Sequence, residues 1–446
     1  MQKLHAIASL PWAKIFRSRR DKLLAAMRKE APDSVAVFFS APVYRRNNDV
    51  EHEFRQDSDF FYLTGFDEPE SALVLDGKKG TFTMFVRPRD PAREIWDGPR
   101  AGVEGAKKSF GADEAYPIAE VEKSLPKLFA DRSTVFYRVG FERSHDDVVL
   151  HALATLKGRG RSTHASPYRM VDVAAIVHEM RLIKDDAEIA VMKAAAAVTD
   201  RAHRSAMRLT KPRMGEHEIE ATLLDHFRQG GSERPAYGSI VGSGPNATIL
   251  HYRLNNRSMK NGELLLIDAG CELGGYASDV TRTFPVNGRF SKEQKAIYNL
   301  VLRAQLQCIK RTVPGANIDA IHQVAVRVLT KGLIDLGLLK GPLDKAIKTE
   351  SYKRFYMHRT SHWLGMDVHD VGNYYSGGKP RKLAPGMVIT IEPGIYIAKN
   401  DKTVGAEWRG IGIRIEDDIL VTRKAPINLT EAIPKTVREV EAACAN

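Results

Sequence analysis

The sequence predicts an α/β protein of two domains, and three observations support this. The chain has 446 residues, which is more than one hydrophobic core usually organises. Residues 1–175 alternate short apolar segments with helical stretches, a pattern typical of a mixed sheet covered by helices. Residues 176–446 surround apolar strands, which end in acidic residues, with long helices. We therefore expect an N-terminal α/β domain over 1–175 and a C-terminal α+β domain over 176–446.

The N-terminal domain shows three apolar runs and two helical stretches. Strands are expected at 35–39, 72–75 and 82–86, and helices at 22–29 and 149–157. The segment 162–167 combines Ser, Thr and Pro, which predicts a loop near the end of the domain. Residues 171–179 lead out of it.

The C-terminal domain carries the longer helices. An Ala-rich, charged run predicts a helix over about 185–208, and a second helix is expected over 215–230. Helical patterns recur at about 291–311 and 318–337, and a helix-like tail follows at 429–446. Two pairs of strands lie between these helices, and both pairs carry acidic residues.

The first pair of strands brings two aspartates together. Residues 264–270 and 276–284 are typical of strands, and the Leu-Gly-Gly segment between them has the chemistry of a turn. If the hairpin is centred between positions 273 and 274, Asp268 lies directly opposite Asp279, with Cβ atoms roughly 4.5–5.5 Å apart. Carboxylates that close repel each other unless cations lie between them. Metal ions about 3.5–4 Å apart, as in two-metal hydrolases, fit that gap.

The second pair repeats this arrangement with glutamates. Residues 387–392 form an apolar strand that ends in Glu392 before a Pro-Gly pair. Residues 412–421 form another strand, which contains Glu416, and a polar loop over 399–410 joins the two. A single acid near a strand end is more often a cap or a surface charge. Two strand pairs that each offer two carboxylates, with a histidine-rich segment between them, favour a metal site.

Three of the 14 histidines, His358, His362 and His369, lie within twelve residues. A lone histidine is more often a core or surface residue, but three among Ser, Gly and Asp indicate a site. One can bind a metal while the others donate hydrogen bonds or move protons. One imidazole with four carboxylates suits two divalent ions. These five residues are Asp268, Asp279, His362, Glu392 and Glu416.

The motifs resemble those of the proline-specific metallopeptidases of the pita-bread fold, above all the Xaa-Pro aminopeptidases (aminopeptidase P). The segments that carry the resemblance keep the family's order and lie at 267–270, 278–283, 361–365, 391–394 and 412–418. Residues 55–66 resemble the N-terminal domain of the same family. The resemblance implies a C-terminal pita-bread catalytic domain and an N-terminal mixed-sheet domain of the creatinase type.

The resemblance also implies a role for each site residue. The five residues above match the family's metal ligands. Among them, Asp279 and Glu416 would bridge both ions, and Glu392 would handle the proton of the attacking water. A further set matches catalytic residues around the substrate, comprising His251, His358, His369 and Arg414. Of these, Arg414 would steady the ligand carboxylates.

Two residues of the N-terminal half, Asp49 and Trp96, match residues that reach the neighbourhood of the active site. Trp96 would do so in a neighbouring subunit, so a homodimer or homotetramer is expected. Arg359 and Thr360 depart from the family, which usually carries Gly and a small or apolar residue there. Arg359 could narrow the pocket or bind a substrate carboxylate. It could equally pair with a surface acid, and we favour that interpretation.

The implied activity is release of the N-terminal residue from peptides with proline in second position, by a dinuclear-metal aminopeptidase. Mn²⁺ is the expected metal, with Co²⁺, Zn²⁺ and Fe²⁺ as alternatives for the same ligands. A prolidase, which cleaves Xaa-Pro dipeptides, would use the same five ligands, but the motifs at 361–363 and 55–66 favour the aminopeptidase. A pita-bread protein that only binds partners would usually lack metal ligands, and all five are present.

Composition restricts the partners and the compartment. No apolar run approaches the roughly 20 residues that span a bilayer, and the first 16 residues lack the pattern of a secretory signal. Three cysteines without close pairing fit a reducing cytoplasm. The net charge of +12 comes mostly from scattered residues. Small basic clusters at 17–20 and 157–161 contain no aromatic residues, so we expect a solvated surface and no nucleic-acid or membrane partner.

Overall fold

The structure is a computed structural model, and it describes residues 9–158 and 164–445. The chain forms two compact units, Leu10–Met180 and Arg181–Asn446. The division falls within helix α8 (Ala174–Leu182). A domain boundary between residues 175 and 176 stays a prediction.

The N-terminal unit is built on a six-stranded mixed sheet in the order β6-β5-β4-β1-β7-β8. Strand β1 pairs antiparallel with β4 and parallel with β7. The strands are β1 (Ser34–Phe39), β4 (Ala72–Asp76), β5 (Phe82–Val86), β6 (Glu114–Pro117), β7 (Thr134–Phe136) and β8 (Arg169–Val171). The helices are α2 (Trp12–Glu30), α3 (Ser58–Thr64), α4 (Pro91–Asp97), α5 (Gly102–Lys108), α6 (Val121–Phe129) and α7 (Arg143–Lys157), and a small hairpin joins β2 (Arg45–Asn47) to β3 (Val50–Glu51). The predicted strands and the mixed sheet are confirmed.

Helix α2 begins ten residues before the expected helix at 22–29. The hydrophobicity pattern does not reveal the first half of this helix, because two of the residues that it buries, Arg19 and Arg20, are charged. Each guanidinium donates to a backbone carbonyl of α3, and Arg20 reaches Leu63 at 2.8 Å. Arginines can pack as apolar stems with polar tips, which a simple apolar count overlooks. The predicted loop at 162–167 begins outside the described residues.

The C-terminal unit surrounds several small sheets with helices. Two sheets carry the site, in the orders β10-β11-β14 and β17-β20-β21. The remaining sheets are β13-β12-β9, β18-β19 and β15-β16. The strands are β9 (Arg234–Pro235), β10 (Ile240–Ser243), β11 (Leu264–Asp268), β12 (Cys271–Leu273), β13 (Tyr276–Ala277), β14 (Thr281–Pro285), β15 (Tyr375–Ser376), β16 (Lys379–Pro380), β17 (Val388–Ile391), β18 (Gly394–Ile397), β19 (Ile411–Arg414), β20 (Asp417–Leu420) and β21 (Ile427–Asn428).

Capping boxes mark the starts of two long helices of this unit. Asp185 caps α9 in a capping box with Glu188, and Ser291 caps α11 in the same way with Gln294. The helices are α9 (Asp186–Leu209), α10 (Glu216–Gln229), α11 (Lys292–Arg311), α12 (Ile318–Asp335), α13 (Leu343–Lys348) and α14 (Val437–Cys444). Within two to three residues at most ends, the first four expected helices are confirmed. The tail helix is shorter than the range 429–446.

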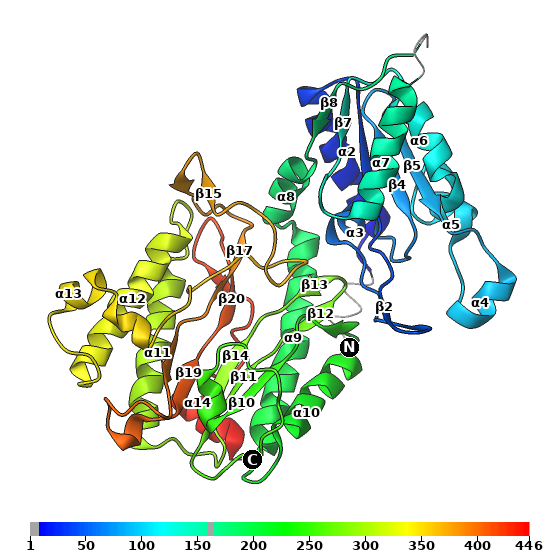
Figure 1. The fold of residues 1–446 in the computed structure, drawn as a ribbon. Helices are drawn as coiled ribbons and strands as arrows, with labels where there is room; N and C mark the ends of the chain where they lie inside the picture. The colour runs from blue at the N-terminus through cyan, green and yellow to red at the C-terminus, as the bar shows by residue number, and fades with distance from the viewer. Residues whose placement is uncertain (1–8, 159–163, 446) are drawn as a thin grey trace. The chain divides into compact units, whose positions relative to one another are not determined.

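One hydrophobic core joins the helices to the strands that carry the acids. Figure 1 shows α9 and α10 along one side of the C-terminal unit and α11 with α12 along the other, with β11, β14, β19 and β20 between them. Ala195 and Val198 of α9 share this core with Leu265 and Ile267 of β11 and Ile413 of β19. The strands are therefore held from outside by helices, and their ends supply the site. Among the described helices, none is both long and apolar enough to cross a bilayer.

Candidate active site

The acids and histidines predicted from the sequence line one cavity of about 1000 Å³ in the C-terminal unit. All five expected metal ligands line it, together with His251, His358, His369 and Arg414. This volume lies at the upper end of typical small-molecule sites. Its wall is apolar in parts, through Ile240, Leu250, Ile318 and Val368.

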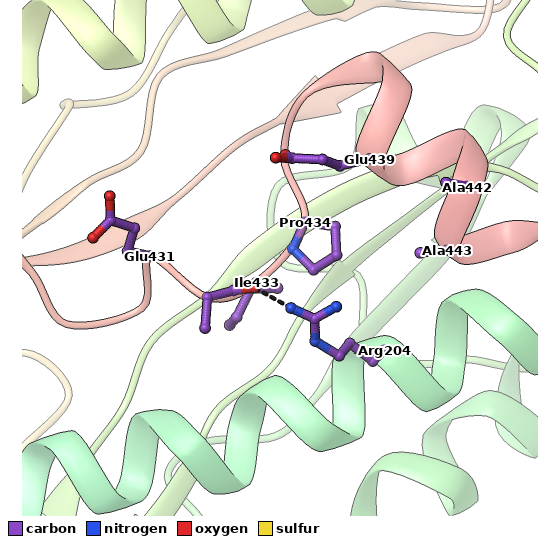
Figure 2. A pocket seen from close by; sticks show the side chains of 8 residues that line it. Arg204, Glu431, Ile433, Pro434, Glu439, Ala442 and Ala443 are labelled. Atoms are coloured by element: carbon purple, nitrogen blue, oxygen red, sulfur yellow. Dashed lines mark hydrogen bonds between the residues drawn. The ribbon is translucent and has the colours of Figure 1, made fainter.

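A second cavity of about 370 Å³ lacks such a cluster (Figure 2). The Arg204 guanidinium donates to the Ala432 carbonyl on one side of it. Glu439 lines it from α14, but its carboxylate accepts the backbone N–H of Thr436 at 3.0 Å and so caps the helix. Arg204 and Glu439 of this cavity therefore serve the fold.

The first hairpin has a different register from the predicted one. Its turn is centred between Gly274 and Gly275, both at positive φ, so Asp268 pairs with Thr281 instead of Asp279. The prediction that the two aspartates lie directly opposite each other is wrong, because two glycines form the tight turn where Leu and Gly were expected to. Asp279 lies in the segment between β13 and β14, and both aspartates line the cavity. The two aspartates therefore still converge.

The second pair has the predicted arrangement. Ile391 pairs with Asp417, and Gly394 pairs with Arg414. The register is the same on both sides of the short unpaired segment between these two pairs. Glu392 is therefore opposite Glu416. The segment is unpaired because Glu392 and Glu416 bond outside their hairpin: their backbone N–H groups donate to Thr360 and Thr281 at 2.9 and 3.1 Å. This bonding links the second hairpin to the first and to the histidine segment.

His362 completes a donor cluster with acids from both hairpins. Ligand atoms of Asp279, His362 and Glu416 all lie within 4.8 Å of one another. His362 Nε2 lies 3.3 Å from Asp279 Oδ2 and 3.8 Å from Glu392 Oε1. Its Nδ1 lies 2.9 Å from the Trp363 carbonyl oxygen. A proton on Nδ1 donates there and leaves the Nε2 lone pair facing the acids, the tautomer that binds metal.

The crowded carboxylates favour added positive charge. Burial and the neighbouring acids raise the pKa of Asp268 and raise the pKa of Glu416 well above its ordinary value. Burial also raises the pKa of Glu392 to about 7. Burial alone would lower the pKa of His362, but the hydrogen bond and charge of Asp279, with the charge of Glu392, raise it to about 9. This donor set is rich in oxygen atoms, is buried and has few neighbouring cations. It therefore fits divalent metal ions.

Arg414 connects the ligand carboxylates to the histidine segment. Its Nη2 donates to Asp268 Oδ2 at 2.6 Å, and its Nε donates to the Thr281 hydroxyl at 3.0 Å. That hydroxyl donates to Glu416 Oε2 at 2.6 Å. Arg414 Nη1 donates to the Tyr396 hydroxyl at 2.9 Å, which also contacts His358 Nε2 at 2.9 Å. One buried guanidinium therefore orients two carboxylates and, through Tyr396, one imidazole.

Sequence reasoning missed Tyr237, whose hydroxyl reaches both first-hairpin aspartates. It lies 2.6 Å from Asp268 Oδ1 and 2.5 Å from Asp279 Oδ1. Burial and these negative charges raise the pKa of Tyr237 well above its ordinary value, so the hydroxyl keeps its proton. No local motif marks this tyrosine. Its position follows from strand pairing, because β10, three residues later, pairs Ile240 with Asp268.

Thr281 and Asp418 were also missed as site residues, although both lie in the motifs quoted above. Thr281 bridges Arg414 and Glu416 through its hydroxyl. Asp418 Oδ2 accepts the backbone N–H of Asp279 at 3.2 Å. The sequence motifs contained these residues, but only the fold shows which side chains they contact.

The three substrate-side histidines differ in exposure. His358 is largely buried, and its Nδ1 lies 3.5 Å from Glu392 Oε2. Burial lowers the pKa of His358 to about 3, so this ring is neutral. His251 and His369 are exposed on the cavity wall, and the His369 ring packs edge-on against His362 with centroids 4.4 Å apart.

Arg359 lines the cavity and is also paired with an acid, and its role toward a substrate stays a prediction. Its guanidinium donates to Asp319 Oδ1, and its side chain is 57% exposed. Asp49 and Trp96 belong to the N-terminal unit, where Asp49 lies in the exposed turn between β2 and β3, and Trp96 on α4 is 83% exposed. Because both belong to that unit, a part for them in the site stays a prediction.

Comparison with known proteins places the chain among metallopeptidases. The pattern of metallopeptidase family M24 matches residues 190–423, and that of the aminopeptidase P N-terminal domain matches residues 16–137. The chain belongs to metallopeptidase family M24. It is 43% identical to an Escherichia coli (strain K12) Xaa-Pro aminopeptidase over 96% of each chain, and 43% identical to one from Haemophilus influenzae over 98% and 99%.

Solved structures agree with this assignment. The structure of Pseudomonas aeruginosa aminopeptidase PepP superposes with a TM-score of 0.96 at 49% identity, covering 98% of each chain. That of proline aminopeptidase P II from Yersinia pestis gives 0.94 at 42% identity, covering 97% of this chain and 99% of the other. The resemblance to the Xaa-Pro aminopeptidases, the pita-bread fold with its N-terminal α/β domain, and the prediction of a hydrolytic metalloenzyme are confirmed.

Proposed function

We propose that the protein releases the N-terminal residue from peptides with proline in second position, using two divalent metal ions. The observation that carries the proposal is the convergence of four carboxylates and His362 in one cavity of a chain 43% identical to Xaa-Pro aminopeptidases over nearly its whole length. The proposed ligands are Asp268, Asp279, His362, Glu392 and Glu416.

The donor set supports two ions rather than one. The second-hairpin acids Glu392 and Glu416 line the same cavity as the first-hairpin acids. Asp279 and Glu416, whose donor atoms cluster with His362, would help to hold both ions. Mn²⁺ is the proposed metal because oxygen-rich sites favour it, and Co²⁺, Zn²⁺ or Fe²⁺ could take the same ligands. When bound, the ions would supply Lewis acidity and make a nucleophile available from water near neutral pH.

The chain's own residues would move the proton and orient the substrate. Glu392 would accept the proton of the attacking water and return it to the leaving nitrogen. The wall histidines His251 and His369 would donate hydrogen bonds to substrate carbonyls. Neutral His358 would line the same site, with its ring nitrogens 2.7 Å from the Arg359 carbonyl oxygen and 2.9 Å from the Tyr396 hydroxyl. A peptide nitrogen of proline carries no N–H, so recognition would depend on the substrate carbonyls and on the apolar wall around Ile240 and Val368.

The rival function is that of a prolidase, which cleaves Xaa-Pro dipeptides with the same ligands. To separate the two, kcat/KM is measured for Ala-Pro and for Ala-Pro-Ala with Mn²⁺ added, and again after chelation. We expect the tripeptide to be cleaved faster and chelated enzyme to be inactive. A strong preference for the dipeptide would make the protein a prolidase. Undiminished activity without metal would refute the metal site.

We also propose a homodimer or homotetramer. The support is α4, on which no residue is buried, and Ile95 and Trp96, each 83% exposed. Exposed apolar side chains of this size are typical of interfaces. Sedimentation of a fully active monomer at assay concentration would refute a functional need for the oligomer.

A cytoplasmic location is proposed from thiol chemistry. Cys271, Cys308 and Cys444 are all free, which suits a reducing compartment. The partners proposed are peptide substrates, without nucleic acid or membrane. Cell fractionation tests the location.

A further inference from the structure

We propose that Arg359 binds a carboxylate on the leaving side of the peptide and thereby sets the preference among Xaa-Pro substrates. The inference deepens the proposed function and rests on it. The carboxylate could be the C-terminus of a short peptide or an acidic side chain after the proline. Both sources present the same planar acceptor, which a guanidinium binds well.

Exposure places Arg359 at the open end of the cavity. The side chains of Asp279, Glu392 and Arg414 at the metal end are 7%, 17% and 4% exposed. The side chain of Arg359 is 57% exposed, and Tyr375 beside its pair is 52% exposed. An aminopeptidase admits only the amino end of its substrate to the closed end. The part of the peptide after the scissile bond, which carries the carboxylate, therefore extends toward the open end, where Arg359 is exposed together with His251 and His369.

The guanidinium keeps donors available for a substrate. Arginine has five N–H donors. Within the described part of the chain, Arg359 donates to Asp319 Oδ1, through Nη2. Asp319 Oδ2 accepts the Tyr375 hydroxyl at 2.9 Å. The acid is thus anchored by two partners and holds Arg359 in place on one side. The N–H groups on Nε and Nη1, and the second hydrogen on Nη2, stay available to a ligand.

The charged residues that line the cavity include few cations that could bind a substrate carboxylate. Five lining residues are acidic, namely Asp268, Asp279, Asp319, Glu392 and Glu416. Three are arginines, and Arg414 already serves Asp268 at 2.6 Å. Four of these acids are the proposed metal ligands, whose charge two divalent ions would offset, and the fifth, Asp319, pairs with Arg359. Among the described residues that line the cavity, Arg253 is the one other arginine that could bind a substrate carboxylate.

The test compares peptides that differ only in a carboxylate. The first arm sets Ala-Pro-Ala against its C-terminal amide, and the second sets Ala-Pro-Glu amide against Ala-Pro-Gln amide, all with Mn²⁺. In the parent we expect at least one carboxylate peptide to have about fivefold higher kcat/KM, chiefly through KM. In Arg359→Gln the ratio should fall below about twofold. The arm that loses its preference identifies the source of the carboxylate.

Three further variants test whether the effect is specific to Arg359. Arg354→Gln removes a comparable Arg–Asp pair, with Asp401, that does not line the cavity, and it should keep the parental ratio. Arg253→Gln should also keep it. Asp319→Asn keeps an acceptor for Arg359 but removes the competing charge, so the ratio should rise about twofold.

The outcomes separate this inference from the proposed function. Cleavage of the amide peptides is sufficient to demonstrate aminopeptidase activity. If the amides are cleaved but the ratios are equal in the parent and Arg359→Gln, the Arg359 inference is wrong and the function stands. Loss of the preference in Arg253→Gln but not in Arg359→Gln, or a lower ratio in Asp319→Asn, would also overturn it. Failure to cleave any Xaa-Pro peptide would refute the function itself.

Discussion

At the scale of single residues, the position of Glu392 separates it from the other ligand acids. Its two oxygens face two different imidazoles, His358 at 3.5 Å and His362 at 3.8 Å. Asp268 and Glu416 are instead held by Arg414 and Thr281. A carboxylate without a rigid hydrogen-bonded partner keeps an oxygen available to receive and return a proton, which suits the role proposed for it.

Glu392→Gln should lower kcat by about 10²–10⁴-fold, the usual contribution of a general base. The amide keeps an oxygen donor and nearly the same shape but does not accept the proton. At least one metal ion should stay bound, which metal analysis of the purified variant checks. Glu407→Gln, on the exposed segment before β19, is the control. Turnover within about threefold of the parent would exclude the proton-transfer role.

Tyr237 is the residue that sequence reasoning had no means of finding, and its removal should be costly. Tyr237→Phe leaves Asp268 and Asp279 without a shared donor. Outer-shell partners of this kind typically contribute about 10–100-fold to metal affinity, so we expect a loss in that range in a metal titration. Tyr298→Phe, which deletes a hydroxyl bonded to the Lys435 carbonyl away from the cavity, should bind metal normally. Equal affinities in both variants would contradict the role of Tyr237.

At the scale of elements, the segment between β11 and β14 decides how the first two aspartates meet. A Cβ at Gly270 would lie 1.8 Å from the Ser278 carbonyl oxygen, so the chain crosses itself closely just after Asp268 and just before Asp279. This crossing allows Asp268 and Asp279 to share one hydroxyl although they are not paired across the hairpin.

Gly270→Ala should therefore destabilise the C-terminal unit by about 3 kcal/mol, at the upper end for overpacking, because backbone cannot move aside like a side chain. It should also weaken metal binding. Gly315→Ala provides the contrast. Gly315 has φ +85 with open space around it, so only backbone strain of about 1 kcal/mol is expected. Urea midpoints with unchanged m-values measure both. Equal losses would show that the crossing is not tight.

Helix α9 gives the unit an acid-sensitive contact through His203. This side chain is fully buried, and its Nε2 donates to the Ala269 carbonyl at 2.9 Å. Burial lowers the pKa of His203 to about 4. Because the folded pKa lies below the unfolded value of about 6.5, the unfolded state binds the proton first. The stabilisation is complete above about pH 6.5 and decreases as the pH falls toward 4.

Between pH 6.5 and pH 5, His203 alone should lower the unfolding free energy by about 2 kcal/mol. His203→Gln should remove that part of the pH dependence, although the variant is less stable at every pH. His217→Gln, on the exposed face of α10, should leave the dependence as in the parent. Denaturant unfolding at several pH values measures this, and identical slopes in the parent and His203→Gln would contradict it.

The sequence predicted the strands, most helices and the four acids and one histidine that meet in the cavity, because each leaves a local signal. Apolar runs locate β11 and β17, and capping boxes locate the starts of α9 and α11. It failed where the decisive contact is made between segments far apart in the chain. Tyr237 and Thr281 are ordinary in their own neighbourhoods. The register of the first hairpin depended on which two residues formed the turn, a choice that hydrophobicity does not distinguish.

At the scale of the whole molecule, the proposed metal ligands are spread over nearly 150 residues of one unit, from Asp268 to Glu416. They come from both hairpins and from the segment that links α13 to β17. Metal binding would therefore join parts of the chain that otherwise meet only through packing and a few hydrogen bonds. All five lie in the C-terminal unit, and none in Leu10–Met180.

Metal should consequently stabilise the C-terminal unit against unfolding and leave the N-terminal unit nearly unchanged. At a free Mn²⁺ concentration about 1,000 times Kd, linkage gives about 4 kcal/mol, or about 10 °C in Tm for a unit of this size. Calorimetry of the full chain, with Mn²⁺ and with chelator, should show one transition that moves and one that stays.

Asp279→Asn is the matched control for this experiment, because it keeps the size of the side chain but removes a carboxylate charge at the centre of the donor cluster. Its C-terminal transition should move by no more than a few degrees with Mn²⁺. If the parent and Asp279→Asn respond equally, the ions stabilise the fold from somewhere other than the cavity. If both transitions of the parent move together, the two units unfold as one, and metal bound at the cavity holds the whole molecule.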